Sequence, residues 1–143
     1  MTKKTHILII TFLLQLTFSF AQSKSTEADK IIGVFWSPKK DAKIEIYKKG
    51  KTYFGKSIWV AVPRKDIENP NVSLRKREIL GIEILSNFSY KNDEYSNGFI
   101  YDPESGKTYN CKMSLNGDKL KVRGYIGISL LGRTEIFERI KSK

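Results

Sequence analysis

The stretch from Gly98 to Arg133 constrains the fold of this chain more than any other part of it. Short runs of alternating apolar and polar residues are separated there by the turn sequences DPESG (102–106) and NGD (116–118). Proline presets the φ angle of a turn, Asp and Ser cap it, and glycine takes the position with positive φ. Asn-Gly between alternating runs is the strongest short-range signal for a hairpin. The stretch therefore predicts antiparallel hairpins in succession.

Similar strand-like runs cover most of the chain after residue 30, and no helical periodicity competes with them. They span residues 31–37, 42–47, 52–62, 79–85, 87–91, 95–101, 107–115, 119–128 and 133–140. Many short strands at such spacing are typical of a sandwich or an up-and-down barrel. Glycines inside or at the ends of the runs favour the barrel, because closure requires bends. We therefore expect an all-β fold: a small antiparallel up-and-down barrel of about 8–10 strands, forming one domain over residues 31–141.

The N-terminus has the three-part pattern of a secretory signal. Lys3 and Lys4 precede an apolar run over residues 7–20, and Ser19 and Ala21 place small residues before Gln22. We expect a signal peptide over residues 1–21, cleaved after Ala21, and over residues 22–30 a flexible leader or else a short helical turn. The mature chain would then be periplasmic or secreted, with no membrane span.

The residues that usually carry catalysis are scarce. The one histidine, His6, lies in the predicted signal peptide, and Cys111 is the one cysteine. Hydrolases of the Ser-His or Cys-His kind and zinc sites therefore lack their side chains. We expect no enzyme activity, no catalytic residue, no metal and no cofactor.

The formal net charge of +11 invites a nucleic-acid partner, but the basic residues are scattered over every turn rather than interleaved with aromatics on one face. We expect no nucleic-acid binding. Attraction to an anionic envelope surface follows from charge alone.

Two groups of residues are candidates for binding. The first lies on consecutive predicted strands and would line a cavity, or else serve ordinary barrel packing or face outward: Tyr101, Tyr109, Arg123 and Tyr125. The second lies in the long polar connection 63–78 and would form a mouth for an anionic group or meet a partner: Arg64, Asp66, Asn69, Arg75 and Arg77. Its alternative is a solvated loop with internal caps from Asp66 and Asn69.

Six motifs in a fixed order carry a family resemblance. They are GVFW (33–36), YFGKSIW (53–59), KDIENP (65–70), LRKREILG (74–81), IYDPESGKTY (100–109) and RGYIGISLLGRT (123–134). Together they closely resemble a family of small secreted bacterial proteins known as domain of unknown function 2147. Members of that family look like calycins, the lipocalin-like barrels that enclose a small apolar cavity. The family has no assigned activity, and Phe137 stands where it usually carries a tryptophan.

The resemblance implies a structural device. In lipocalin-like barrels a first-strand tryptophan packs beneath a last-strand arginine, which assigns barrel closure here to Trp36 and Arg139, with Phe137 beside them.

Two classes of function stay open. The first is an exported barrel that binds a small apolar or amphipathic molecule in the cell envelope without covalent chemistry. The alternative is an interaction module with a filled barrel, whose 63–78 loop engages an envelope protein or polysaccharide. A cavity of roughly 300 Å³ or more would favour the first.

Overall fold

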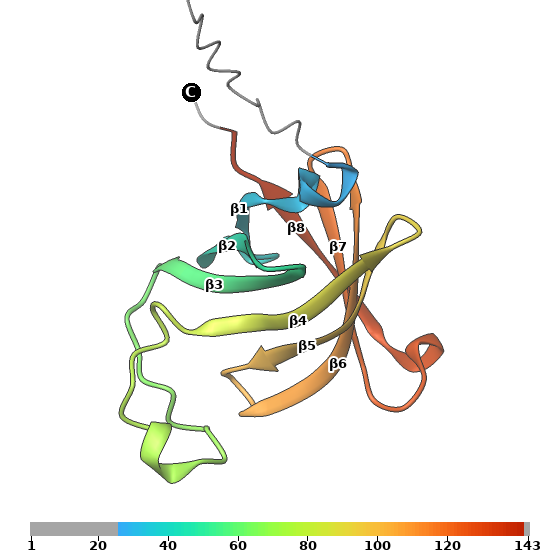
Figure 1. Cartoon of the computed structure of the whole chain (residues 1–143). Coiled ribbons are helices and arrows are strands. Elements are labelled where there is room, and N and C mark those ends of the chain that lie inside the picture. The colour runs from blue at the N-terminus through green and yellow to red at the C-terminus, as the bar shows by residue number, and fades with distance from the viewer. Residues whose placement is uncertain (1–25, 142–143) are drawn as a thin grey trace, which may run out of the picture.

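The chain forms a closed barrel of eight antiparallel strands, each paired with its neighbour in sequence, with β1 and β8 completing the ring (Figure 1). The computed structural model describes residues 26–141, so the predicted signal peptide lies outside the described residues. The predicted up-and-down barrel is confirmed. The strands are β1 (Gly33–Trp36), β2 (Ala42–Lys49), β3 (Thr52–Val60), β4 (Glu83–Lys91), β5 (Glu94–Asp102), β6 (Lys107–Asn116), β7 (Lys119–Tyr125) and β8 (Arg133–Arg139). Three short 3-10 helices accompany them: η1 (Glu27–Ile31), η2 (Val72–Leu74) and η3 (Ser129–Leu131).

Two runs that the sequence suggests as separate strands, 79–85 and 87–91, meet in the one bent strand β4. Residues 79–82 of the first run belong instead to the connection before β4. Asn87 has a left-handed backbone (φ 63°), and Asn97 on the partner strand β5 has one too (φ 59°). Asparagine adopts this conformation more readily than most residues. Because both strands turn at the same level, the β4–β5 hairpin bends as a unit. Phe88 then lies over Gly98, where a Cβ atom would overlap its ring.

We expect Gly98→Ala to lower the free energy of unfolding by about 1–3 kcal/mol, the usual cost of overpacking a tight core site, as measured by urea unfolding. Gly124→Ala is the matched control, since a Cβ there would meet a methyl group of Ile100 at 3.3 Å, beside a cavity that gives the methyl room to move. An equal loss of unfolding free energy in both variants would contradict a special role for the contact between Phe88 and Gly98.

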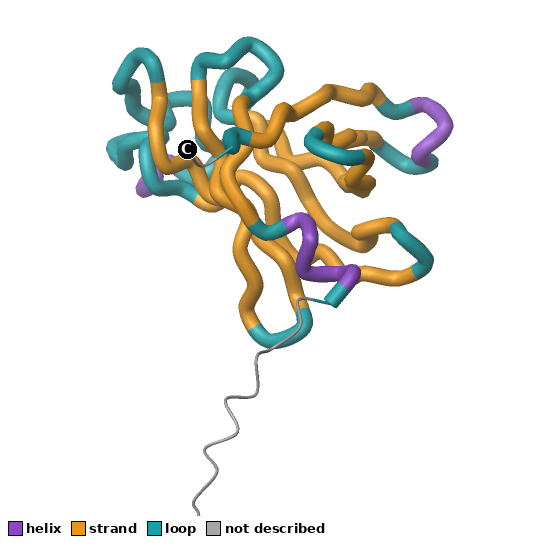
Figure 2. The backbone as a smooth tube through the Cα atoms, turned by 90° about the horizontal axis from the view of Figure 1, so that it is seen from above, coloured by secondary structure: helices purple, strands orange, loops and turns teal. Residues whose placement is uncertain are grey.

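The up-and-down topology sends alternate connections to opposite ends of the barrel (Figure 2). The turns at 50–51, 92–93 and 117–118 share one end with η1, which we name the closed end. The connections 37–41, 61–82, 103–106 and 126–132 share the other, which we name the open end.

Helix η1 covers the closed end. Its Ile31 is fully buried, the Tyr95 hydroxyl donates to the carbonyl of Ala28 at 2.7 Å, and Lys48 and Tyr53 both donate to the carboxylate of Asp29. These two hydrogen bonds hold the pKa of Asp29 below its usual range, and the bond from Lys48 has the larger effect. Of the two alternatives for residues 22–30, residues 27–30 adopt the short helical turn and not the flexible leader, because side chains of β2, β3 and β5 fix them in place. Residues 22–25 lie outside the described part.

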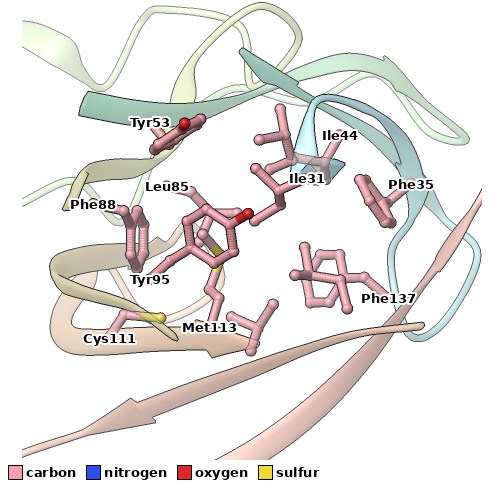
Figure 3. Close-up of a cluster of buried hydrophobic side chains, with 13 residues drawn as sticks. Ile31, Phe35, Ile44, Tyr53, Leu85, Phe88, Tyr95, Cys111, Met113 and Phe137 are labelled. Carbon is pink, nitrogen blue, oxygen red and sulfur yellow. The ribbon is translucent and has the colours of Figure 1, made fainter. Parts of the chain in front are cut away.

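The hydrophobic core fills the half of the barrel beneath η1 (Figure 3). Inward-facing side chains of all eight strands contribute, as strand alternation requires. The buried cluster comprises Ile31, Phe35, Ile44, Ile46, Tyr53, Leu85, Phe88, Tyr95, Cys111, Met113, Leu120, Val122 and Phe137.

Barrel closure uses Arg139 as expected, but with Phe35 instead of Trp36. The Arg139 guanidinium lies over the Phe35 ring, 4.5 Å from its centroid, and donates to the carbonyls of Lys30 and Ile32. Alternation explains the error: since Phe35 faces inward, Trp36 faces outward. There Trp36 packs edge-on against Trp59, with the Lys43 ammonium group 4.8 Å from its ring centre.

We expect Arg139→Met to lower the free energy of unfolding by about 1–3 kcal/mol, because two carbonyls that accept from the guanidinium lose their donor. Arg139→Lys should recover only part of this, since one ammonium group does not reproduce the planar fork of donors. Urea unfolding of the three proteins measures the series. Full recovery by lysine would show that charge alone matters at this position.

Candidate ligand-binding cavity

The open half of the barrel contains a cavity of about 720 Å³. Its floor is the top of the core, formed by Ile44, Val122 and Phe137, which belong both to the buried cluster and to the cavity lining. Phe137, expected at the barrel closure, therefore contributes to the floor instead. Ile84 and Ile100 add aliphatic walls. The inner surface therefore suits an apolar guest.

Two hydroxyl groups place hydrogen-bonding atoms on this surface. Ser57 is buried, and its hydroxyl donates to the carbonyl of Ile79 and accepts from the backbone N–H of Gly81 at 3.0 Å, so it anchors the end of the 61–82 connection. Tyr109 is half-buried in the wall. Its hydroxyl has no hydrogen-bond partner within residues 26–141 and is therefore available to a guest.

The rim of the cavity is charged and carries both signs. Glu104 lies 3.7 Å from Arg64 and 3.7 Å from Lys39, and Arg133 pairs with Glu135 at 2.6 Å. These groups are largely exposed, so the pairs contribute little to stability. They can instead exchange partners with a polar head group at the mouth.

The 61–82 connection is held in shape by a buried carboxylate. Asp66 is fully buried and accepts hydrogen bonds from Tyr101 (2.5 Å), Asn69 (2.7 Å) and Arg77 (2.9 Å). Burial alone would raise the pKa of Asp66, but the three hydrogen bonds and the Arg77 charge outweigh it and lower the pKa. Burial and the bond to Asp66 raise the pKa of Tyr101 to about 12. Arg75 completes the cluster by donating to the carbonyl of Asn69 at 2.7 Å.

The candidate residues from the sequence therefore divide into cavity lining, cavity rim and contacts within the 61–82 connection. Tyr109 and Tyr101 line the cavity, and Arg64 lies on its rim. Asp66 and Asn69 bond within the connection, in line with the alternative of internal caps, and Arg77 joins them as a donor to Asp66.

Arg123 and Tyr125 do not line the cavity. Because Leu120, Val122 and Gly124 face the interior, alternation places Arg123 and Tyr125 on the outer wall. Arg123 there donates to the carbonyls of Ser129 and Leu130 in the β7–β8 connection.

The sequence reasoning missed the aliphatic lining and Ser57. The signal for Ile44 and Val122 was present, since each occupies an inward position of an alternating strand. Ile84 and Ile100 lie at or just beyond irregularities in the pairing of β4 with β3 and of β5 with β6, so strict alternation does not give their direction. Alternation identifies an inward side chain but does not tell whether it meets a packed neighbour or a cavity.

A smaller hollow of about 440 Å³ lies at the closed end, between η1 and the turns beside it. The ion pair between Glu27 and Lys30, at 2.6 Å, borders it. The polar lining makes it less suited to an apolar guest than the open-end cavity.

Neither site has the residues of a metal centre. Within residues 26–141 no group of three His, Cys, Asp or Glu side chains is placed to hold a metal ion. The Cys111 thiol is fully buried, and burial raises its pKa to about 12, so it stays protonated at neutral pH. In the same part of the chain, no helix has the length and apolar character needed to cross a membrane.

An eight-stranded up-and-down barrel, plugged at one end and hollow at the other, defines a lipocalin-like protein. A solved structure with this fold is that of HP1028 from Helicobacter pylori, described as belonging to the lipocalin family. The two structures agree with a TM-score of 0.71 at 22% sequence identity, over 78% of this chain and 84% of that one. This chain belongs to the family described as "Uncharacterized protein conserved in bacteria (DUF2147)", which matches residues 33–139. A comparison with curated proteins found no match.

We expect Asp66→Asn to lower the free energy of unfolding by about 1–3 kcal/mol at neutral pH, because it removes a buried charge that accepts from three donors. A free aspartate has a pKa of about 3.9, and the folded value lies below it. The stabilisation is therefore complete above about pH 4 and disappears as the pH falls through the folded pKa. The difference between the two proteins in urea unfolding should narrow in acid.

Glu68→Gln is the control, since this carboxylate lies exposed in the same connection. It should leave stability nearly unchanged. A difference between wild type and Asp66→Asn that is constant from neutral to acid pH would contradict the role of the charge.

Proposed function

We propose that this protein is an exported, non-enzymatic binding protein that holds a small apolar or amphipathic molecule in its open-end cavity. One observation carries the proposal: the cavity measures about 720 Å³, well above the roughly 300 Å³ at which ligand sites begin. The apolar floor and walls suit the body of such a molecule. The Tyr109 hydroxyl and the charged rim suit a polar end.

The exported and non-enzymatic parts of the proposal rest on the residues. Lys3, Lys4, Ser19 and Ala21 support export to the envelope. The absence of histidine after His6 and the buried, protonated Cys111 thiol support binding without covalent chemistry.

The alternative, an interaction module with a filled barrel, is less well supported. The core fills the closed half and leaves the open half hollow. Four of the five loop residues that this alternative would use already form hydrogen bonds within the protein, namely Asp66, Asn69, Arg75 and Arg77.

The test is to fill the cavity and measure binding of two fluorescent probes, N-phenyl-naphthylamine and cis-parinaric acid. Ile100→Trp places an indole in the cavity wall and should weaken binding at least about tenfold, which corresponds to about 1.4 kcal/mol. Ile136→Trp, on the outer face of β8, adds the same group outside the cavity and should leave binding unchanged.

Equal affinity of the Ile100→Trp and Ile136→Trp variants would refute binding in this cavity. Native mass spectrometry of protein purified from the envelope is a second, independent measurement, which would identify a co-purified natural guest by its mass. An envelope preparation that carries no co-purified small molecule, together with no probe binding, would favour the interaction module.

A further inference from the structure

The exposed apolar side chains of this protein are concentrated at one end. In residues 26–141, every large aliphatic side chain that is more than half exposed lies in the two connections 61–82 and 126–132. Both belong to the open end. The set is Val62, Ile67, Val72, Leu80, Ile126, Ile128, Leu130 and Leu131. The closed-end turns instead consist of glycine and polar residues, namely Gly50-Lys51, Asn92-Asp93 and Gly117-Asp118. The closed end therefore suits water, whereas the open end suits an apolar surface.

The 126–132 connection, here named the apolar loop, has the highest density of such side chains. Ile126, Ile128, Leu130 and Leu131 are 61–80% exposed, within six residues. The apolar loop projects from the barrel between β7 and β8 (Figure 1). Four exposed aliphatic side chains on a projecting loop are costly in water unless something covers them.

The tip of the apolar loop has part of its backbone bonded. Arg123 donates to the carbonyls of Ser129 (2.7 Å) and Leu130 (3.0 Å), and the N–H groups of Leu131 and Gly132 donate to Ile128 and Ser129. An unbonded backbone group is costly in hydrocarbon, because no water is present there to bond it. These bonds at the helical turn η3 lower that cost where Leu130 and Leu131 project, so the tip is the part of the loop that best suits shallow insertion into a bilayer.

The flanking charges favour an anionic surface. Arg133, 87% exposed, stands at the base of the apolar loop. The second connection carries Arg64, Lys65, Arg75, Lys76 and Arg77 against Asp66, Glu68 and Glu78. Basic residues beside inserted apolar side chains are the combination by which peripheral proteins bind anionic lipid.

We propose that the open end docks on an anionic phospholipid bilayer, with the apolar loop inserted among the lipid chains and the 61–82 connection resting on the surface. A bilayer suits this loop better than a protein partner or a second copy. A stable protein interface needs about 800 Å² on each side, whereas a projecting tip is covered completely by insertion. This inference does not depend on the cavity being a ligand site.

The first test measures co-sedimentation of the mature chain, from Gln22 onward, with vesicles of phosphatidylglycerol and phosphatidylethanolamine, and with vesicles of phosphatidylcholine alone. The double variant Leu130→Ser with Leu131→Ser removes apolar area without adding charge, and should bind the anionic vesicles at least about tenfold more weakly. Ile58→Ser with Ile136→Ser is the matched control, since both residues are partly exposed on the barrel wall, and it should bind like wild type. Binding to phosphatidylcholine should be weaker throughout.

Equal binding by the Leu130/Leu131 variant and the wild type would overturn the proposal, because the affinity would then lie elsewhere in the chain. No binding of the wild type to anionic vesicles would overturn it too. So would a dimer, seen by analytical ultracentrifugation, that the same two substitutions dissociate, since a second copy would then cover the loop.

The second test places a reporter on the loop itself. Leu130→Cys is labelled with the polarity-sensitive dye NBD, while the buried, protonated Cys111 stays unlabelled in the folded protein. Addition of anionic vesicles should shift the emission to shorter wavelength. Lys51→Cys, at a closed-end turn, should show no shift. A shift at both positions, or at neither, would refute docking through the open end.

Discussion

The guanidinium group of Arg139 is the contact on which the rest of this barrel depends. The seam between β1 and β8 has only two paired positions, Phe35 with Arg139 and Trp36 with Glu138. Arg139 strengthens it from the inside by covering the Phe35 ring and bonding the carbonyls of Lys30 and Ile32. Gly33 makes room, because a Cβ there would overlap the guanidinium. One side chain therefore serves both the closure of the ring and the docking of η1, at the end of the barrel that the core fills.

The division into a filled closed end and a hollow open end determines the form of the half that contains the cavity. Tyr53 and Tyr95 reach from the strands to η1, so their bulk fills the interior under it. At the other end the connections are held by contacts outside the barrel, such as Asp66 with Tyr101 and Arg123 with Ser129. No side chain needs to cross the interior there, and the space between Ile44, Ile100 and Phe137 stays empty. The solid end supplies the stability that the hollow end requires.

Local pattern was enough to predict the barrel but not its site. Asn116-Gly117 and the alternation around Val122 depend on neighbours in sequence, so the strands and their inward faces could be read directly. The same alternation, applied consistently, would have excluded Arg123 and Tyr125 from the interior and Trp36 from the closure. Asp66 and Arg139 are different, because their partners lie 35 and 107 residues away. No local pattern reports such pairings, and the volume of a cavity depends on all of the walls at once.

The even number of strands has a practical consequence. Since β1 begins and β8 ends at the closed end, the two extremities of the barrel emerge side by side, on the side remote from the cavity mouth (Figure 1). A fluorescent protein or an immobilising tag attached at either extremity would therefore leave the mouth unobstructed. A short linker could also join the extremities, and new termini could then be opened at the Gly50-Lys51 turn. The barrel is thus suited to circular permutation without any change to the end that carries its function.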